Sequence, residues 1–214
     1  MSPRPGGFTL VLHTHLPWVL HHGRWPHGSD WLCEAVAECY LPLLGVLEPR
    51  ARAGTSLGIT LGMSPVLCEQ LAHPDFAAEF RAYLAHRRAA GAEDTQRFTA
   101  EARPREAALA RRWVRFYGEV HAAWSADPDL LARFSRLERL GAIELITTAA
   151  THAYLPLLAT TAAVRRQVAI ARQSHARHFG RDPRGFWLPE CAYRPDGPWA
   201  SPTRADVTES WRPG

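Results

Sequence analysis

Four short apolar runs, separated by helical sequence, constrain the fold of this chain more than any other feature. They are Phe8–His15, Ser56–Met63, Ala142–Thr148 and Gly185–Leu188. Each run is continuously apolar instead of alternating, which is typical of parallel strands that are covered on both faces. Because helical sequence lies between the runs, the pattern predicts an α/β fold with a parallel sheet.

The stretches between these runs carry helix signals. Ser29 and Asp30 are expected to cap a helix that Pro42 should break or kink. Pro104 is expected to open a long helix, because the apolar residues that follow it keep to one helical face. The helical sequence between residues 65 and 139 is too long for a simple crossover between two strands. It therefore predicts a large helical insertion in the α/β fold.

The sequence after Tyr193 contains four prolines and is expected to form a loop, not a terminal helix or strand. A fourth strand that is followed only by a loop lacks the helix that normally covers it. We therefore expect the sequence to be truncated after its fourth strand.

The charge of the chain argues against nucleic acid as a partner. The formal net charge is +4, and all 25 basic residues are arginines. They are dispersed among Glu and Ala along the predicted helices, whereas a nucleic-acid interface requires a basic stripe. No segment is long and apolar enough to span a membrane, and no signal-peptide cleavage site is visible. The expected location is the cytoplasm.

Cysteine spacing predicts neither a zinc centre nor a disulfide framework, because none of the four cysteines forms a C-x-x-C pair. Histidines are more informative. His13 and His15 end the first apolar run, and residues two apart in a strand face the same side. His152 follows the third run, and active sites of barrel enzymes lie at the C-terminal ends of strands. These imidazoles are open to three interpretations: local hydrogen bonds, a metal site, or contacts to substrate hydroxyls.

A carboxylate, Glu190, follows the fourth run inside the aromatic sequence GFWLPECAY. Burying a carboxylate without a partner is costly, so Glu190 is either a solvated loop residue in a salt bridge or a catalytic group. Trp187 belongs to an aromatic surrounding of the kind that binds the apolar faces of sugars. Trp25, in the loop after the first run, is either a wall of the same site or a surface residue held by Pro26.

Three segments together resemble glycoside hydrolase family 57, and most of all its branching enzymes. They are LVLHTHLPW at 10–18, ITTAATHAYLPLL at 146–158 and GFWLPECAYRPDGPW at 185–199. The resemblance runs in order along essentially the whole chain. It implies that residues 1–214 are the truncated N-terminal catalytic domain, an incomplete (β/α)7 barrel, and that the later barrel strands and a C-terminal helical domain are absent. It also implies a retaining enzyme that cleaves α-1,4 links and forms α-1,6 branches in amylose, glycogen or maltooligosaccharide.

The resemblance also implies residue roles. Glu190 falls on the family's nucleophile, and the remaining positions are implied to bind substrate: His13, His15, His152, Trp25 and Trp187. No metal or cofactor is implied. The family's acid/base is an Asp further downstream, and no Asp of this sequence matches that motif. The chain alone is therefore expected to lack branching activity.

Other activities stay open at this point. An amylase, an amylopullulanase or a 4-α-glucanotransferase of the same family differs mainly in the acceptor that it uses. A metal-dependent barrel hydrolase with His13, His15 and His152 as ligands is a rival of another class. A degenerate relative that only binds glucan is a third alternative.

Overall fold

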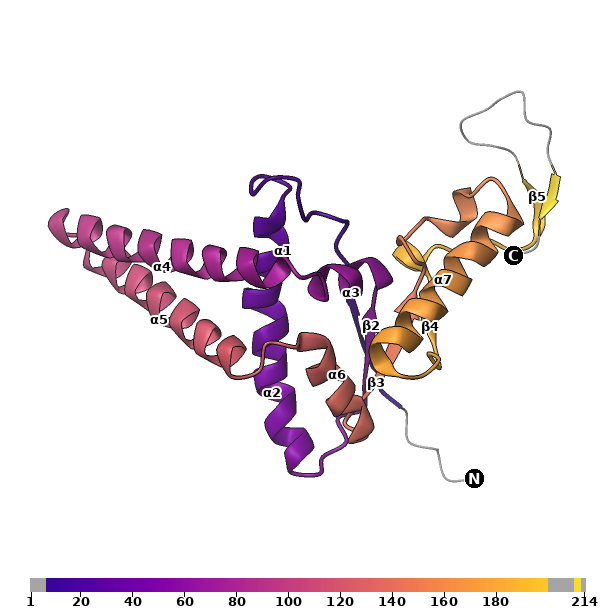
Figure 1. Ribbon diagram of the computed structural model, residues 1–214, viewed down its shortest axis with the longest axis horizontal. Coiled ribbons are helices and arrows are strands. Elements are labelled where there is room, and N and C mark those ends of the chain that lie inside the picture. The colour runs from indigo at the N-terminus through magenta and orange to yellow at the C-terminus, as the bar shows by residue number, and fades with distance from the viewer. Residues whose placement is uncertain (1–6, 200–209, 213–214) are drawn as a thin grey trace. The chain divides into compact units, whose positions relative to one another are not determined.

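The computed structural model describes residues 7–199 and 210–212, and it divides the chain into two compact units (Figure 1). The sheet unit comprises Met1–Trp18, Gly54–Glu69 and Ser135–Gly214. The helical unit comprises Val19–Ala53 and Gln70–Phe134. In the part of the chain that is described, every helix is too short or too polar to cross a membrane.

Four parallel strands form the sheet of the sheet unit, and they neighbour one another in chain order. They are β1 (Leu10–Thr14), β2 (Ile59–Met63), β3 (Ile143–Thr148) and β4 (Phe186–Trp187). The prediction of four parallel strands at these positions is confirmed, although each strand starts later than its apolar run. The β1–β2 ladder begins only at the pair Leu10 and Ile59, so Phe8 and Thr9 lie outside it. This consecutive order is that of a βα-barrel wall.

Two helices and two 3₁₀ turns belong wholly or mostly to the sheet unit. They are α3 (Pro65–Leu71), η2 (Leu155–Leu157), α7 (Thr161–Phe179) and η3 (Pro189–Cys191). The Thr160 hydroxyl caps α7 by accepting from the Ala163 amide, and Gly180 ends the helix with a φ of 76°. Both ends follow local capping rules, since glycine tolerates the left-handed conformation at a helix C-terminus.

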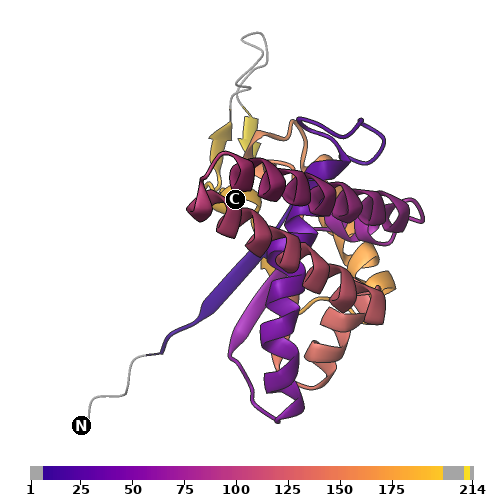
Figure 2. The same cartoon turned by 90° about the vertical axis from the view of Figure 1, so that its left-hand side faces the viewer.

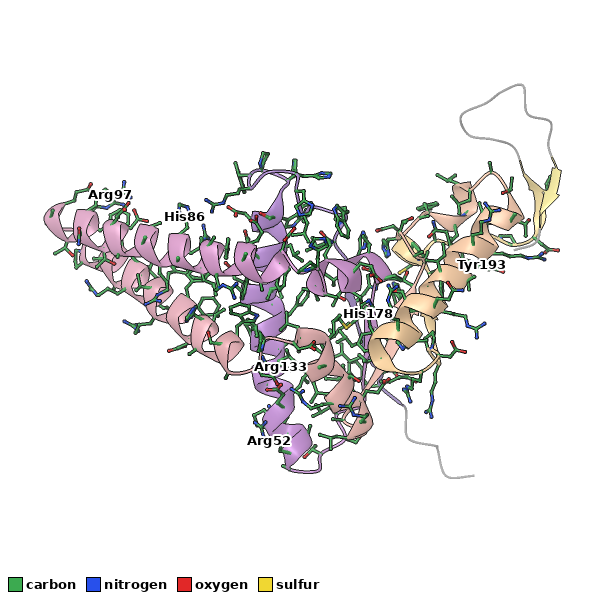
Figure 3. All side chains as sticks on the ribbon, in the orientation of Figure 1. Arg52, His86, Arg97, Arg133, His178 and Tyr193 are labelled. Carbon is green, nitrogen blue, oxygen red and sulfur yellow. The ribbon has the colours of Figure 1, made fainter. Side chains whose placement is uncertain are left out.

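Helix α7 is tied to Glu69 of α3 by a network of hydrogen bonds. Ser174 donates to Glu69 at 2.8 Å, His178 lies at 3.1 Å, and Arg177 forms an ion pair with the same carboxylate (His178 is labelled in Figure 3). Burial alone would raise the pKa of Glu69, but these hydrogen bonds and charges bring it below its ordinary value. Glu69 is therefore a charged anchor between the two helices.

The helical unit begins with α1 (Ser29–Ala35), a π-helical segment η1 (Val36–Tyr40) and α2 (Leu41–Arg52), which follow one another without a break. The helix does not break at Pro42, and the expected irregularity there takes the form of the π-helical segment. The Leu41 amide donates to Val36 O across the wider π turn. Such a turn relieves the clash between a proline ring and the carbonyl four residues earlier, so the helix continues.

The expected cap of this helix is wrong. The N-cap residue is Gly28, which has no side chain that could accept a hydrogen bond from the helix. Ser29 lies inside the helix. The Ser29 hydroxyl donates to Glu79 at 2.9 Å, and Asp30 pairs with Arg24 at 3.1 Å. The side chains of Ser29 and Asp30 therefore bond to Glu79 and Arg24 and do not cap the helix.

The predicted helical insertion is an antiparallel hairpin of α4 (Phe76–Ala100) and α5 (Pro104–Ala126), which lie side by side (Figures 1 and 2). Aromatic rings join the two helices: Phe80 and Trp124 at 5.3 Å, and Tyr83 and Tyr117 at 6.1 Å, both edge to face. Arg97 lies near the tip of the hairpin (Figure 3).

Helix α6 (Leu130–Arg139) follows and carries a buried ion pair. Arg133 is 6% exposed and contacts both carboxylate oxygens of Glu48 on α2, at 2.7 and 2.9 Å (Figure 3). The guanidinium and the carboxylate form a bidentate ion pair. Such a pair is strong and restricts the orientation of α6 relative to α2.

The expectation of a structureless C-terminal loop is wrong in part. β5 (Gly197–Trp199) and β6 (Ser210–Arg212) pair as antiparallel strands. Pro198, opposite Trp211, cannot donate to a ladder, and this is why the local sequence argues against a strand there. The rest of the expected loop, 200–209 and 213–214, lies outside the described residues.

Candidate active site

The structure brings together the four polar residues that the sequence places at strand ends in the sheet unit. Parallel strands end at the same edge of a sheet, so residues that follow β1, β3 and β4 meet there. His13 lies in β1 and His15 directly after it, His152 follows β3, and Glu190 lies in η3 after β4. The His15 and His152 rings stack at 3.9 Å, and the His13 and His152 rings at 4.9 Å.

Neighbouring strands supply the contacts that hold the first two histidines. Gly62 of β2 is the register partner of His13, and a Cβ added there would lie 3.1 Å from His13 Nδ1. His15 Nδ1 lies 3.2 Å from the Ser64 hydroxyl, which follows β2. The absence of a side chain at Gly62 therefore leaves the room that the His13 ring occupies.

Two of these residues have an unusual backbone. His152 has a φ of 54°, and Glu190 has a φ of 56° with a ψ of 23°. Residues other than glycine rarely adopt this left-handed conformation, and such strained positions concentrate at functional sites. At Glu190 this conformation follows Pro189 directly and directs the carboxylate to His152.

Glu190 is a paired but accessible carboxylate. Its Oε1 lies 3.3 Å from His152 Nε2, and its side chain is 67% exposed, whereas the His152 side chain is only 5% exposed. One side of the carboxylate thus contacts an imidazole while the rest is open to solvent. A carboxylate that attacks an external molecule requires this combination of a fixed position and an open face.

The three histidines are neutral at pH 7. Burial, with repulsion from His152 and His13, lowers the pKa of His15 to about 4. Burial also lowers the pKa of His13 and of His152, although the nearby Glu190 charge acts in the opposite direction for both. Desolvation penalises the charged form of a buried imidazole, so neutral rings are the stable form in this cluster.

The contact with Glu190 indicates which nitrogen of His152 carries the proton. A carboxylate only accepts, so the 3.3 Å separation between Glu190 Oε1 and His152 Nε2 is a hydrogen bond when Nε2 bears the hydrogen. Nδ1 of the neutral ring then carries the lone pair and lies 3.4 Å from the Thr148 hydroxyl, which donates to Trp187 O at 2.7 Å.

His13 is the most enclosed of the three rings. Both its nitrogens are buried and have no hydrogen-bond partner among the described residues. Its ring lies 6.1 Å from the Trp187 ring at an angle of 24°. Direct contact between His13 and a sugar hydroxyl therefore requires the ring to shift, whereas His152 already contacts Glu190.

Sequence reasoning singled out two tryptophans and missed several contributors. Trp187, the last residue of β4, lies with its ring beside that of His13. Trp25 belongs to the helical unit, where its side chain is 79% exposed. Thr148 and Gly62 were not expected to take part, because only the register between strands shows their contacts.

Exposed aromatic side chains also follow the two strained residues and were not singled out. Tyr154 is 47% exposed and Tyr193 is 72% exposed (Figure 3). The sequence could have indicated both tyrosines, because Tyr154 lies two residues after His152 and Tyr193 three residues after Glu190.

The arrangement of the rings bears on the metal interpretation. A metal needs imidazole lone pairs that converge on one point at about 2.0–2.1 Å from each nitrogen. Rings stacked within 23° of parallel direct their in-plane lone pairs side by side. The donor set His13, His15 and His152 therefore does not fit a metal in this arrangement.

A cavity of about 470 Å³ lies at the other end of the strands, near the N-terminal residues Ile59 and Ile143. Arg139, Arg184 and Glu144 are among its lining residues. It is separate from the strand ends that carry the histidines and Glu190, so it is not part of this site.

Comparison with known proteins identifies the family. The sequence model of glycosyl hydrolase family 57 matches residues 9–201. The chain belongs to this family. The match includes both histidines of the first strand, His152 and Glu190. The structure also agrees with the expected fold, the N-terminal portion of a family 57 (β/α)7 barrel with many added helices.

Curated relatives of the family 57 chain are named as branching enzymes. A 1,4-alpha-glucan branching enzyme of Thermococcus kodakarensis is 39% identical over 198 residues, which cover 92% of this chain and 29% of that enzyme. A probable 1,4-alpha-glucan branching enzyme of Mycobacterium tuberculosis is 38% identical, with 91% of this chain and 39% of the relative covered. The chain thus spans less than half the length of these relatives.

Solved structures similar to the chain include a branching enzyme and an amylase. The crystal structure of a branching enzyme of this family from Pyrococcus horikoshii matches with a TM-score of 0.88 and 41% identity, over 96% of this chain and 38% of that one. The alpha-amylase AmyC from Thermotoga maritima matches with a TM-score of 0.76 and 28% identity, over 88% of this chain and 36% of that one.

Proposed function

We propose that this chain carries the nucleophile of a retaining 1,4-α-glucan branching enzyme, and that Glu190 is that nucleophile. The observation that carries the proposal is the Glu190 carboxylate itself. It lies at the end of β4 in a strained backbone, contacts the neutral His152, and is 67% exposed. The names of the relatives, at 38–41% identity over more than nine-tenths of this chain, support branching as the outcome.

The proposed reaction has two steps with inversion at each, so the anomeric configuration is retained. Glu190 attacks the anomeric carbon and forms a glycosyl ester, while the bond to the leaving 4-oxygen breaks and that oxygen receives a proton. A 6-hydroxyl of another glucan segment then attacks the same carbon, loses its proton and releases Glu190. Retaining enzymes use a second carboxyl about 5–5.5 Å away as the acid and base. We assign no residue of this chain to that second role.

We propose that the histidines position both the nucleophile and the sugar. The Nε2–H of His152 donates to Glu190 Oε1, so the ring holds the carboxylate in one position. His15, anchored at Ser64, supplies a polar edge for sugar hydroxyls. Hydrogen bonds of this kind stabilise the transition state when they are oriented before the reaction. His13 and Trp187 form the support behind His152. Trp25 is also proposed to bind glucan.

The proposed substrate is an α-1,4-glucan such as amylose, glycogen or a maltooligosaccharide, and the proposed role is glycogen biosynthesis. Residues 1–214 are proposed to be the N-terminal part of the catalytic domain. A cytoplasmic location stays a prediction of the sequence.

The test uses the complete gene product that carries this sequence, incubated with amylose. Branch points are counted after enzymatic debranching, and iodine staining follows the loss of long linear chains. We expect new α-1,6 links from the unmodified protein. Glu190→Gln should reduce their formation at least about a thousandfold, because an amide cannot form the glycosyl ester.

The matched control is Glu93→Gln on the exposed surface of α4, which should keep full activity. Equal losses in the two variants would contradict the role of Glu190. New reducing ends without branches would favour hydrolysis, the alternative suggested by the likeness to AmyC. Redistributed linear chains would favour 4-α-glucanotransfer. Glucan binding without any turnover would leave a binding protein.

A further inference from the structure

A second cluster of histidines lies in the helical unit and takes no part in the proposed reaction. His21, His73 and Asp75 each offer one ligand atom, and these atoms all lie within 4.8 Å of one another. His21 Nε2 is 2.9 Å from Asp75 Oδ2, and His73 Nδ1 is 3.7 Å from the same oxygen. We propose that these three side chains bind a divalent first-row transition-metal ion of the Zn²⁺ type.

The chemistry of the donors favours this class of ion. Two imidazoles and one carboxylate suit Zn²⁺ and its neighbours, whereas Ca²⁺ and Mg²⁺ prefer oxygen ligands alone. Bonds of about 2.0–2.1 Å in a tetrahedral site hold donor atoms roughly 3.3 Å apart. The two measured separations, 2.9 and 3.7 Å, lie on either side of that value. Water would complete the coordination.

The backbone directs the three residues toward one another. His21 has a left-handed φ of 68°, which is uncommon for a residue other than glycine. Asp75 occupies the N-cap position of α4, yet its side chain makes no capping hydrogen bond. An aspartate at this position ordinarily accepts from the first turn of its own helix. Here the carboxylate contacts the imidazoles instead, so local capping does not explain its orientation.

Binding the ion requires small rearrangements that the exposure of these side chains permits. The side chains of His21 and Asp75 are 55% and 59% exposed, and that of His73 is 28% exposed. The Asp75 amide donates to His73 Nδ1 at 3.2 Å, and coordination through Nδ1 would transfer that amide to water. Because the amide lies at an exposed turn, this exchange has a small free-energy cost.

A bound ion would join two segments of the helical unit that are far apart in sequence. His21 belongs to the loop that also carries Trp25, and Asp75 stands at the start of α4. The ion would therefore fix this loop to the helix hairpin. Metal sites that connect distant segments stabilise the folded chain, because the site does not exist in the unfolded state.

The test is calorimetric titration of the chelator-treated complete gene product with ZnCl₂ at pH 7.5, with circular dichroism as the check of folding. We expect one ion per chain, and at least a tenfold loss of affinity in His73→Ala and in Asp75→Asn. His27→Ala is the matched control from the same loop, because His27 contacts Trp31 and lies outside the cluster. Its affinity should equal that of the unmodified chain.

Other donors offer clear ways to overturn the proposal. His152→Ala should leave the affinity unchanged; if it abolishes binding while His73→Ala does not, the ion belongs to the active-site histidines. Binding that is unaffected by both Asp75→Asn and His73→Ala, or that never saturates at one ion, would also refute the site. Replacing Zn²⁺ by Co²⁺ should give visible absorption bands that are lost in Asp75→Asn, which distinguishes coordination from a loss of folding.

Discussion

The active-site edge of the sheet unit and the α4–α5 hairpin of the helical unit obey different rules. In the hairpin, charges pair with close neighbours in sequence, such as Arg97 with Asp94 at 2.7 Å. Its left-handed residue, Ala102, lies in the turn where the chain reverses. At the active-site edge, left-handed residues carry the proposed chemistry, and His13 has two buried nitrogens without a described partner.

The comparison shows that unfavourable local conformations and buried nitrogens without a described partner are found at the active-site edge. The hairpin forms because each element agrees with its own sequence, a property that gives stability. The active-site edge contradicts local preference at His152 and Glu190, and contacts from neighbouring strands must hold it in place. Substitutions in the hairpin should therefore change stability, whereas substitutions at the edge should change activity first.

The largest effect on stability is expected at the Arg133–Glu48 ion pair of the helical unit, because both side chains are mostly buried. Arg133→Ala leaves Glu48 without its partner in a partly buried position and should lower the free energy of unfolding by about 2–3 kcal/mol. Arg97→Ala removes an exposed pair and should cost less than about 0.5 kcal/mol. Urea unfolding followed by circular dichroism measures both, and equal losses would contradict the distinction between buried and exposed pairs.

Acid should destabilise the active-site edge before it affects the hairpin. His15 has a pKa of about 4 in the folded chain against an ordinary value of 6.5, so the unfolded chain binds more protons between these values. Its contribution is complete above pH 6.5 and is lost as the pH falls toward 4; because the ring is only half-buried, solvent screening reduces it to about 1–2 kcal/mol. His15→Gln should flatten the pH dependence of the urea midpoint. A midpoint that rises on acidification would contradict the sign.

Gly62 offers a smaller and more specific change at the same edge. In Gly62→Ala the new Cβ would lie 3.1 Å from His13 Nδ1, which forces the ring to move by a few tenths of an ångström. We expect branching by the complete gene product to fall about tenfold in kcat, because displacements this small matter where groups are pre-oriented. Unchanged activity in a folded variant would show that His13 does not need its present position.

Gly118 is the matched glycine of the hairpin, and its substitution should have the opposite sign. It lies inside α5, and a Cβ added there would meet nothing within 4 Å. Gly118→Ala should raise the free energy of unfolding by about 0.5–1 kcal/mol, because alanine loses less backbone entropy in a helix. Branching should be unaffected. A loss of stability in thermal unfolding would show a contact that the hairpin makes in solution.

The sequence predicts the regular parts of the fold well. Continuous apolar runs locate all four parallel strands, and Pro104 and Gly180 mark helix ends because proline and glycine act within one turn of the chain. The π-helical segment before Pro42 and the strand at Pro198 were not predictable. In both cases contacts elsewhere outweigh the local preference of proline.

The candidate site was predictable in composition but not in detail. The two-residue spacing of His13 and His15, and the position of Glu190 after a strand, follow from the sequence alone. The stacking of the rings depends on strand register, which brings together residues far apart in sequence, as in the Thr148–Trp187 contact across 39 residues. The left-handed backbone at Glu190 has no local sequence signal, because glutamate does not favour it.

The π-helical segment Val36–Tyr40 makes the continuous helix α1–η1–α2 sensitive to the deletion of a single residue. Each residue of an α-helix advances the chain by about 100° around the axis. Deleting one residue here would restore regular α-helix, but it would rotate the preceding turns by that angle relative to α2. Leu32 and Cys33, both fully buried, would then point away from the core. A one-codon deletion within this helix should therefore be far more damaging than the replacement of any single exposed residue along it.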